Sequence, residues 1–206
     1  MSKVKAFFKR KDIEVSLKRY GIDALGAMAQ GLFCSLLIGT IIKTLGTQLG
    51  VQFITDIGTY AMAVSGPAMA VAIGYALKSP PMVLFSLAAV GWAANAEGGA
   101  GGPLAVLIIA IAAAECGKAV SKETKVDLLV TPGVTILVGV ALAKLIAPPI
   151  GTAANALGLL IIEATNLRPF FMGILVSVIV GVALTLPISS AAICSVLGLT
   201  GLAGGA

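Results

Sequence analysis

Long apolar runs, separated by prolines, glycines and a few charged residues, make up most of the chain after residue 23. A helix that crosses a bilayer needs ~20 mainly apolar residues. Five runs reach or approach that length: 24–46, 55–77, 104–120, 128–147 and 169–186. Residues 82–96 and 152–165 are too short to cross alone, and the tail from Pro187 onward begins with a helix breaker. The pattern predicts an all-α polytopic membrane protein of about six to seven membrane segments, including short or re-entrant helices broken by proline and glycine.

The first 20 residues differ from the rest of the chain. Val4, Phe7, Phe8 and Val15 fall on one side of a helix among several lysines. Such a pattern favours a helix that lies on anionic lipid headgroups, although a solvated arm remains an alternative. We therefore divide the chain into a basic amphipathic cytoplasmic or interfacial segment, 1–20, and a helical transmembrane domain, 21–206.

Small residues recur at four-residue spacing inside the apolar runs. Gly66, Ala70 and Gly74 form one such ridge. In lipid, helices associate by close packing rather than by hydrophobic exclusion, and small residues allow that approach. The ridge predicts a packed helical bundle rather than a set of independent anchors.

The charge is concentrated at the N-terminus. Residues 1–19 hold seven cations and two anions, a net +5, whereas the other 187 residues hold seven of each sign. With 58% hydrophobic and 11% charged residues, a soluble domain and a nucleic-acid-binding protein are both excluded. Because cations resist translocation, an N-terminus in the cytoplasm is predicted; it places 12 of the 14 cations on that side.

The residue types present also restrict the chemistry. The chain has no histidine and three widely spaced cysteines, Cys34, Cys116 and Cys194, each in an apolar stretch. These cysteines are expected to be small buried hydrophobic residues. No catalytic residue, metal site or cofactor is predicted, so the chain is not expected to be an enzyme.

One polar break interrupts the apolar part at residues 95–103, where Asn95 and Glu97 precede a dense run of glycines. Its backbone amides would lack partners in lipid, so the segment is either a surface loop or the lining of a protein cavity.

Other isolated charges have simpler explanations. Lys43, Asp56 and Lys144 lie near predicted helix ends, from which they reach the interface. Glu115 fits either an interface or a cavity.

A second polar region runs from Pro148-Pro149 to Pro169 and contains Asn155, Glu163, Asn166 and Arg168. A short helix between two proline breaks predicts a re-entrant segment whose ends offer backbone groups to a solute. A surface Glu163–Arg168 pair on an interfacial helix is the alternative. Ser189 and Ser190, which follow Pro187, form a smaller break of the same kind.

Three stretches resemble a known family: TPGVTILVGVALAKLIAPPIGTAANALG (131–158), LRPFFMGILVSVIVGVALTLPISSAAI (167–193) and GLTGLAGGA (198–206). They are similar to the membrane subunit of the phosphotransferase system, enzyme IIC, and more closely to its perfringolysin O regulator-like branch. The resemblance covers most of residues 20–206. It implies a homo-oligomeric, multi-pass protein of the bacterial inner membrane that binds and translocates a sugar or sugar-like solute.

The resemblance also implies partners: IIA and IIB subunits would supply the phosphate, and this subunit would carry no phosphoryl group. The matching positions are PPIG (148–151), Glu163, RPF (168–170) and PISS (187–190). Two features depart from the family: the sugar-site histidine of other branches is missing, and relatives continue beyond residue 206. The predicted solute-binding residues are Asn95, Glu97, Asn155, Glu163, Asn166, Arg168, Ser189 and Ser190. A membrane sensor or regulator that does not transport is the main alternative, and a small pore is a third.

Overall fold

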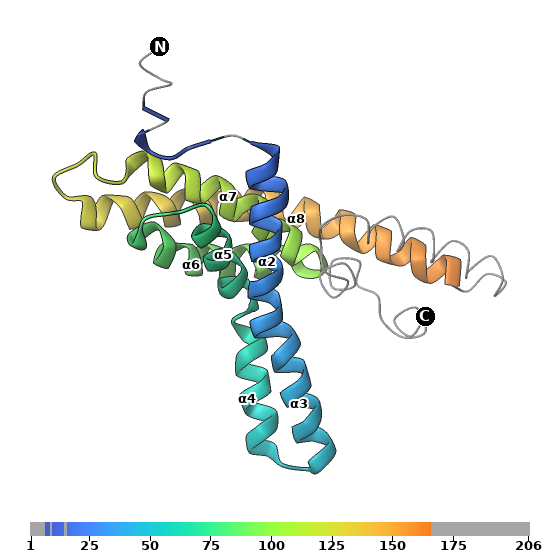
Figure 1. The fold of residues 1–206 in the computed structure, drawn as a ribbon. Coiled ribbons are helices and arrows are strands. Elements are labelled where there is room, and N and C mark those ends of the chain that lie inside the picture. Colours follow the sequence, from blue (N-terminus) through green and yellow to red (C-terminus); the bar gives the residue numbers. More distant parts are fainter. Residues whose placement is uncertain (1–6, 9, 15, 166–206) are drawn as a thin grey trace.

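The computed structural model describes residues 7–8, 10–14 and 16–165, with side chains except at residues 100, 155 and 157–165. Its described elements are all helical, and no strand occurs among them. The all-α fold class predicted from the apolar runs is therefore confirmed. The helices form a packed body from which two parts project (Figure 1).

A long helical run opens the fold. It consists of η1 (Arg19–Asp23), α2 (Ala24–Leu32), η2 (Phe33–Leu37) and α3 (Ile38–Leu49). The 31 residues are long and apolar enough to cross a membrane, which confirms the span predicted at 24–46 and lengthens it at both ends. Gly50, with φ +66°, ends the run in the left-handed conformation that favours glycine. The chain then turns into α4 (Gln52–Ala63).

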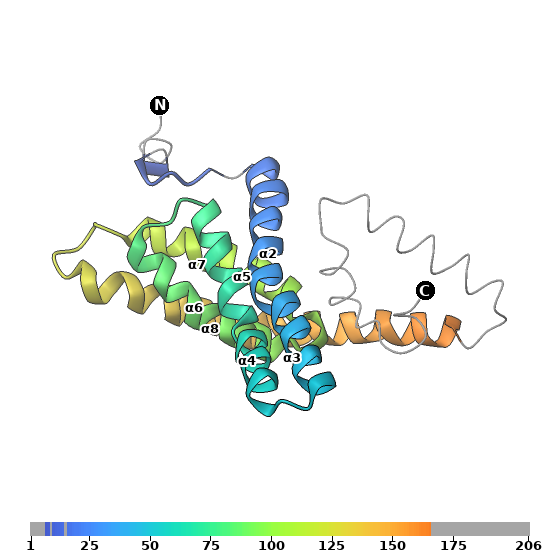
Figure 2. The ribbon, with the colours of Figure 1, turned by 60° about the horizontal axis from the view of Figure 1, so that its bottom comes forward.

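The two helices α3 and α4 form a hairpin that projects from the body (Figures 1 and 2). Glycines bring them together: a Cβ added at Gly58 would lie 2.6 Å from the carbonyl oxygen of Gly39. The outer surface of the hairpin is apolar, with Phe53 and Tyr60 each 74% exposed. Lys43 and Asp56 are also exposed on it. The apolar side chains suit contact with lipid hydrocarbon, whereas the charged groups of Lys43 and Asp56 would have to reach the membrane interface.

The span predicted at 55–77 is wrong as a single helix. The structure divides it into α4 and α5 (Ser65–Ala76), which meet at Val64 with a bend of 46°. Pro67 explains the break, because it has no N–H to donate to Ala63 and its ring clashes with that carbonyl. In the first turn of a new helix the missing N–H costs nothing, because that N–H has no partner within the helix. Helix α5 begins at Ser65, which places Pro67 in its first turn.

The body is built from α2, α5, α6 (Pro81–Gly98), α7 (Gly102–Val120) and the first half of α8 (Asp127–Thr165). Its α6 packs against α5, α7 and α8, while α2 covers α5 (Figure 2). The predicted ridge lies at the α5–α6 contact. A Cβ at Gly66 would be 2.5 Å from the carbonyl oxygen of Gly91, and Gly74 contacts Leu87. The prediction of a closely packed bundle is confirmed, as are the helices expected at 82–96 and 104–120.

The break predicted at Pro148-Pro149 is also wrong, because α8 continues through both prolines to Thr165. Proline fixes φ near its helical value, so the pair removes two backbone donors without forcing the chain to turn. Membrane helices tolerate this, since side-chain hydroxyls and neighbouring helices satisfy freed groups. Here the Thr152 hydroxyl donates to the carbonyl oxygen of Pro149 at 2.9 Å. The separate short helix expected at 152–165 is therefore the second half of α8, which extends past the body.

Three helical runs among the described residues are long and apolar enough to span a membrane, or four if α4 and α5 form one bent span. The total number of segments stays a prediction. Large apolar side chains cover the outside of the body, including Phe85 and Leu137, each 72% exposed. The expectation that the cysteines are buried is wrong for Cys34 and Cys116, which are exposed on this surface. Where lipid hydrocarbon surrounds the bundle, an apolar side chain gains nothing by moving from the surface to the interior.

Candidate functional site

The glycine turn, residues 98–102, packs against α8 rather than forming a surface loop. It joins α6 to α7 through the short η3 (Gly99–Gly101). Gly98, Gly101 and Gly102 are buried. A Cβ at Gly101 would lie 2.9 Å from the carbonyl oxygen of Ile150, and one at Gly151 would lie 2.5 Å from that of Gly98. The polar region predicted at 95–103 therefore meets the beginning of the one predicted at 148–169.

Asn95 and Glu97 lie on the last turn of α6, beside this contact. Asn95 is half-buried between α5 and α7, and its Oδ1 would be 2.5 Å from a Cβ at Gly102. Glu97 faces α8, where its Oε1 accepts a hydrogen bond from Lys144 Nζ at 2.8 Å. The side chains of Glu97 and Lys144 are 36% and 68% exposed. The last turn of α6 thus carries the Glu97–Lys144 ion pair and the half-buried side-chain amide of Asn95.

Lys144 is a residue that sequence reasoning missed at this site, having been explained by its nearness to a helix end. The available signal was the presence of Glu97 and Lys144 as charges of opposite sign within apolar segments. Charges in such segments usually face a partner, because an unpaired charge in lipid is costly. Pairing across two helices also fixes α6 against α8 at the level of the glycine turn.

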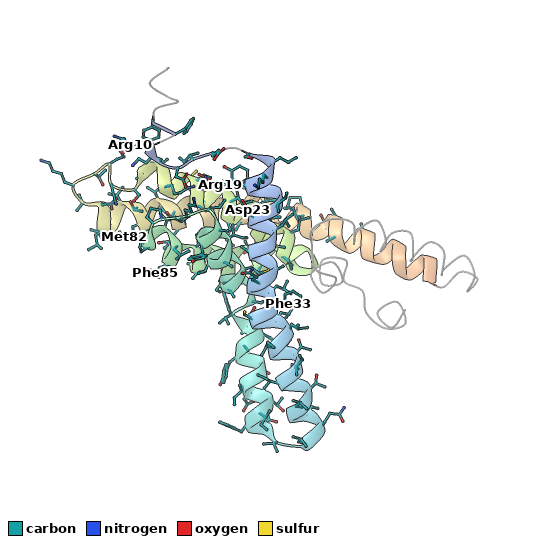
Figure 3. The ribbon with its side chains drawn as sticks, in the orientation of Figure 1. Arg10, Arg19, Asp23, Phe33, Met82 and Phe85 are labelled. Atoms are coloured by element: carbon teal, nitrogen blue, oxygen red, sulfur yellow. The ribbon has the colours of Figure 1, made fainter. Side chains whose placement is uncertain are left out.

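At the other end of α6, residues 10–12 and Arg19 contact the chain where α5 and α7 end. We call this set of contacts the N-terminal junction. Lys11 donates to the carbonyl oxygen of Ser121 and pairs with Glu123 at 2.5 Å, while Arg10 pairs with Glu123 at 2.6 Å. Arg19 pairs with Asp12 at 2.7 Å. Figure 3 shows Arg10 on the N-terminal segment and Arg19 at the start of the long helical run. The predicted interfacial helix over 1–20 is not continuous, since the chain turns at Asp12, whose φ is +51°.

Lys118 is buried at the centre of this junction. Its Nζ donates to the carbonyl oxygens of Asp12 and Leu77, at 3.0 and 3.2 Å, and to Glu115 Oε1 at 3.0 Å. Arg19 also donates to Leu77, at 2.8 Å. Two cations therefore satisfy the carbonyl that ends α5, where the helix dipole is negative. The sequence left two positions open for Glu115, the membrane interface or a cavity. In the structure Glu115 instead forms an ion pair with the buried Lys118 inside the junction.

A family model described as phosphotransferase system, EIIC, matches residues 22–206, which includes the glycine turn, all of α8 and the chain beyond it. The chain belongs to the EIIC family. EIIC subunits are the membrane transport subunits of the phosphotransferase system and work with IIA and IIB partners, which handle the phosphoryl group. Comparison with curated proteins and with solved structures gave no match. The family and the apolar spans together place the protein in a membrane.

The other predicted solute-binding residues of this EIIC chain are less fully described. Asn155 and Glu163 fall on α8, about one and three turns beyond Gly151, and their side chains lie outside the described ones. Asn166, Arg168, Ser189 and Ser190 lie outside the described residues altogether. Their roles stay predictions.

The N-terminal junction of this EIIC chain is expected to loosen in acid. The hydrogen bond from Arg19 lowers the pKa of Asp12 below its ordinary 3.8, and the Lys11 hydrogen bond lowers the pKa of Glu123 below 4.5. A group whose pKa is depressed by folding stabilises the fold above its ordinary pKa and loses that contribution as pH falls through the depressed value. Limited proteolysis within residues 7–20 should therefore accelerate below about pH 4 and be unchanged between pH 6 and 8. Equal cleavage rates at pH 3.5 and 7, measured with a protease of matched activity, would contradict this.

Proposed function

We propose that this EIIC chain binds a sugar or sugar-like solute and carries it across the bacterial inner membrane, with its N-terminus in the cytoplasm and as a homo-oligomer. The observation that carries the proposal is the contact between the glycine turn and residues 150–151 of α8. It brings the interruption between α6 and α7 against the proline pair of the continuous helix α8, where two backbone N–H donors are missing. Transporters commonly build their solute sites where helices are interrupted near the bilayer midplane.

The groups gathered at this contact suit a polyhydroxylated solute. Carboxylates accept hydrogen bonds from hydroxyls, and amides both donate and accept them. Pro148 and Pro149 lack backbone donors, so the carbonyls of Lys144 and Leu145 do not receive the usual helical hydrogen bond. These carbonyls lie next to the Glu97–Lys144 pair on the chain, so this level of α8 carries two backbone acceptors beside an ion pair. Asn95 and Glu97 would line the site from α6, and the predicted residues from Asn155 to Ser190 would complete it.

Replacing Glu163 by glutamine is expected to weaken solute binding by about tenfold or more, because a charged hydrogen-bond acceptor becomes a neutral one. Equilibrium binding of a panel of labelled sugars and polyols to the detergent-purified chain would measure the effect. Asp56→Asn is the matched control, since Asp56 is an exposed carboxylate on the projecting hairpin, bonded to Gln52 at 2.8 Å. Unchanged affinity in Glu163→Gln would remove Glu163 from the site.

A further inference from the structure

A basic cavity lies at the N-terminal junction, away from the glycine turn. It has a volume of about 340 Å³, and the charged residues of its lining are Arg10, Lys11, Lys78, Lys118, Lys122, Asp12 and Glu123. Five cations against two carboxylates give the lining a formal charge of +3. The neighbouring cavity, of about 310 Å³, has Lys18, Arg19 and Lys78 against Glu14 and Asp23, a formal charge of only +1.

The cations of the basic cavity fall into two groups. Lys11, Lys118 and Arg10 are held by carbonyl oxygens or by Glu123 and Glu115. Lys78 and Lys122 are exposed, and their ammonium groups make no hydrogen bond or ion pair within the described part of the chain. Buried cations thus donate to the helix-end carbonyls, and the ammonium groups of Lys78 and Lys122, which have no partner among the described residues, line the cavity.

Both free lysines adopt a backbone conformation that is unfavourable for lysine. Across the described residues, the non-glycine residues with positive φ are Asp12, Lys78 and Lys122, at 51°, 55° and 61°, and all three line the basic cavity. Lys78 follows the C-cap of α5 and Lys122 that of α7, positions where glycine is the usual residue. A lysine in the last helical turn would interact with the helix dipole without this strain. Strained residues of this kind concentrate where a site needs a particular side chain.

The backbones of these lysines are also fixed in place. Asp127 Oδ1 accepts a hydrogen bond from the Lys122 N–H at 2.7 Å. The N–H groups of Lys78 and Ser79 donate to the carbonyls of Tyr75 and Gly74, each at 2.9 Å. The points at which the two lysine side chains are attached are therefore fixed, one after α5 and one after α7, and Arg10, whose side chain is 63% exposed, lines the same cavity.

We propose that the basic cavity binds a phosphate group, carried either by an anionic lipid headgroup at the membrane surface or by a free phosphate ion. A phosphate offers several strong acceptor oxygens and at least one full negative charge, which lysine and arginine recognise as charge-assisted partners. The site lies at the opposite end of α6 from Glu97 and does not rest on the solute assignment. Its occupant would hold together the α5–α6 and α7–α8 connections, which Lys78 and Lys122 occupy.

The test uses a variant that removes both charges and also relieves the strain, Lys78→Gly with Lys122→Gly. Calorimetric titration of the detergent-purified chain compares inorganic phosphate with dioctanoyl phosphatidylglycerol, and dioctanoyl phosphatidylcholine, whose choline cation cancels the phosphate charge, is the zwitterionic comparison. The wild-type chain should bind one of the two anions saturably. The double variant should lose at least about tenfold in affinity while its thermal stability is unchanged or higher.

Lys125→Gly is the matched control, because it removes a charge from the same α7–α8 connection but does not line the cavity. It should bind within about twofold of the wild type. Tighter binding of phosphatidylglycerol than of inorganic phosphate assigns the site to a lipid headgroup, and the reverse assigns it to a free ion. The proposal is overturned if neither anion binds saturably, or if Lys125→Gly weakens binding as much as the double variant. Because the titration measures no sugar, its failure leaves the transport proposal standing.

Discussion

Replacing Gly91 by leucine is expected to disrupt the packed body of the protein. A Cβ at Gly91 would run into the carbonyl oxygen of Gly66 and lie 2.5 Å from the Cβ of Ala70. Both obstacles belong to α5, and a carbonyl cannot turn away as a flexible side chain can. Overpacking of this kind costs about 3 kcal/mol or more. For a chain of this size, that lowers the Tm by roughly 6–12 °C.

Gly26→Leu provides the control, because a Cβ at Gly26 meets nothing within 4 Å. Both substitutions add the same side chain to a membrane helix, so they differ only in what surrounds it. Thermal unfolding in a mild detergent, followed by size-exclusion chromatography, measures the difference. If the Gly91→Leu and Gly26→Leu proteins unfold at the same temperature, α5 and α6 do not pack as described.

Removing the Lys118 ammonium is the second change with a large expected effect. Lys118→Met keeps most of the length of the side chain but leaves the Leu77 carbonyl with one donor fewer and Glu115 without its cation. Breaking a buried ion pair by removing one partner costs about 3–5 kcal/mol, because the remaining charge is left uncompensated. The Glu115 side chain is only 15% exposed, so water compensates it poorly.

A double-mutant cycle separates this effect from lost packing. Lys118→Met combined with Glu115→Gln should recover much of the stability lost in Lys118→Met alone, since no uncompensated charge remains. Thermal melts of the wild type and the three variants give the coupling energy directly. Additive losses in the double variant would contradict a structural tie between Lys118 and Glu115.

The main features of the fold follow from local patterns in the sequence. Apolar length predicts the spans, and the Gly66–Ala70–Gly74 spacing predicts the packed α5–α6 contact, because small residues allow close approach wherever the helix lies. The prolines were harder to interpret. Pro67 ends one helix and Pro148-Pro149 does not end another, although all three residues lack the same backbone donor. The outcome depends on what the neighbouring helices and hydroxyls satisfy, which is not a local property.

The candidate site could be predicted only in part for the same reason. Asn95 and Glu97 are recognisable as polar residues in an apolar run, but their partners come from tertiary contacts. Lys144 lies 47 residues from Glu97, and no local pattern connects them. Likewise, the basic N-terminal segment has a recognisable charge, whereas the contacts of Lys11 and Arg10 with Glu123 require the folded bundle.

Partner-dependent uptake tests the central claim most directly. Cells that express the full chain with IIA and IIB partners are given a panel of labelled sugars and polyols, and the intracellular label is separated into free and phosphorylated forms. Transport by an EIIC subunit predicts that at least one solute accumulates as its phosphate, that accumulation requires both this chain and its partners, and that Glu163→Gln reduces it. Intracellular label that never exceeds the level in cells lacking the chain would contradict the proposed function.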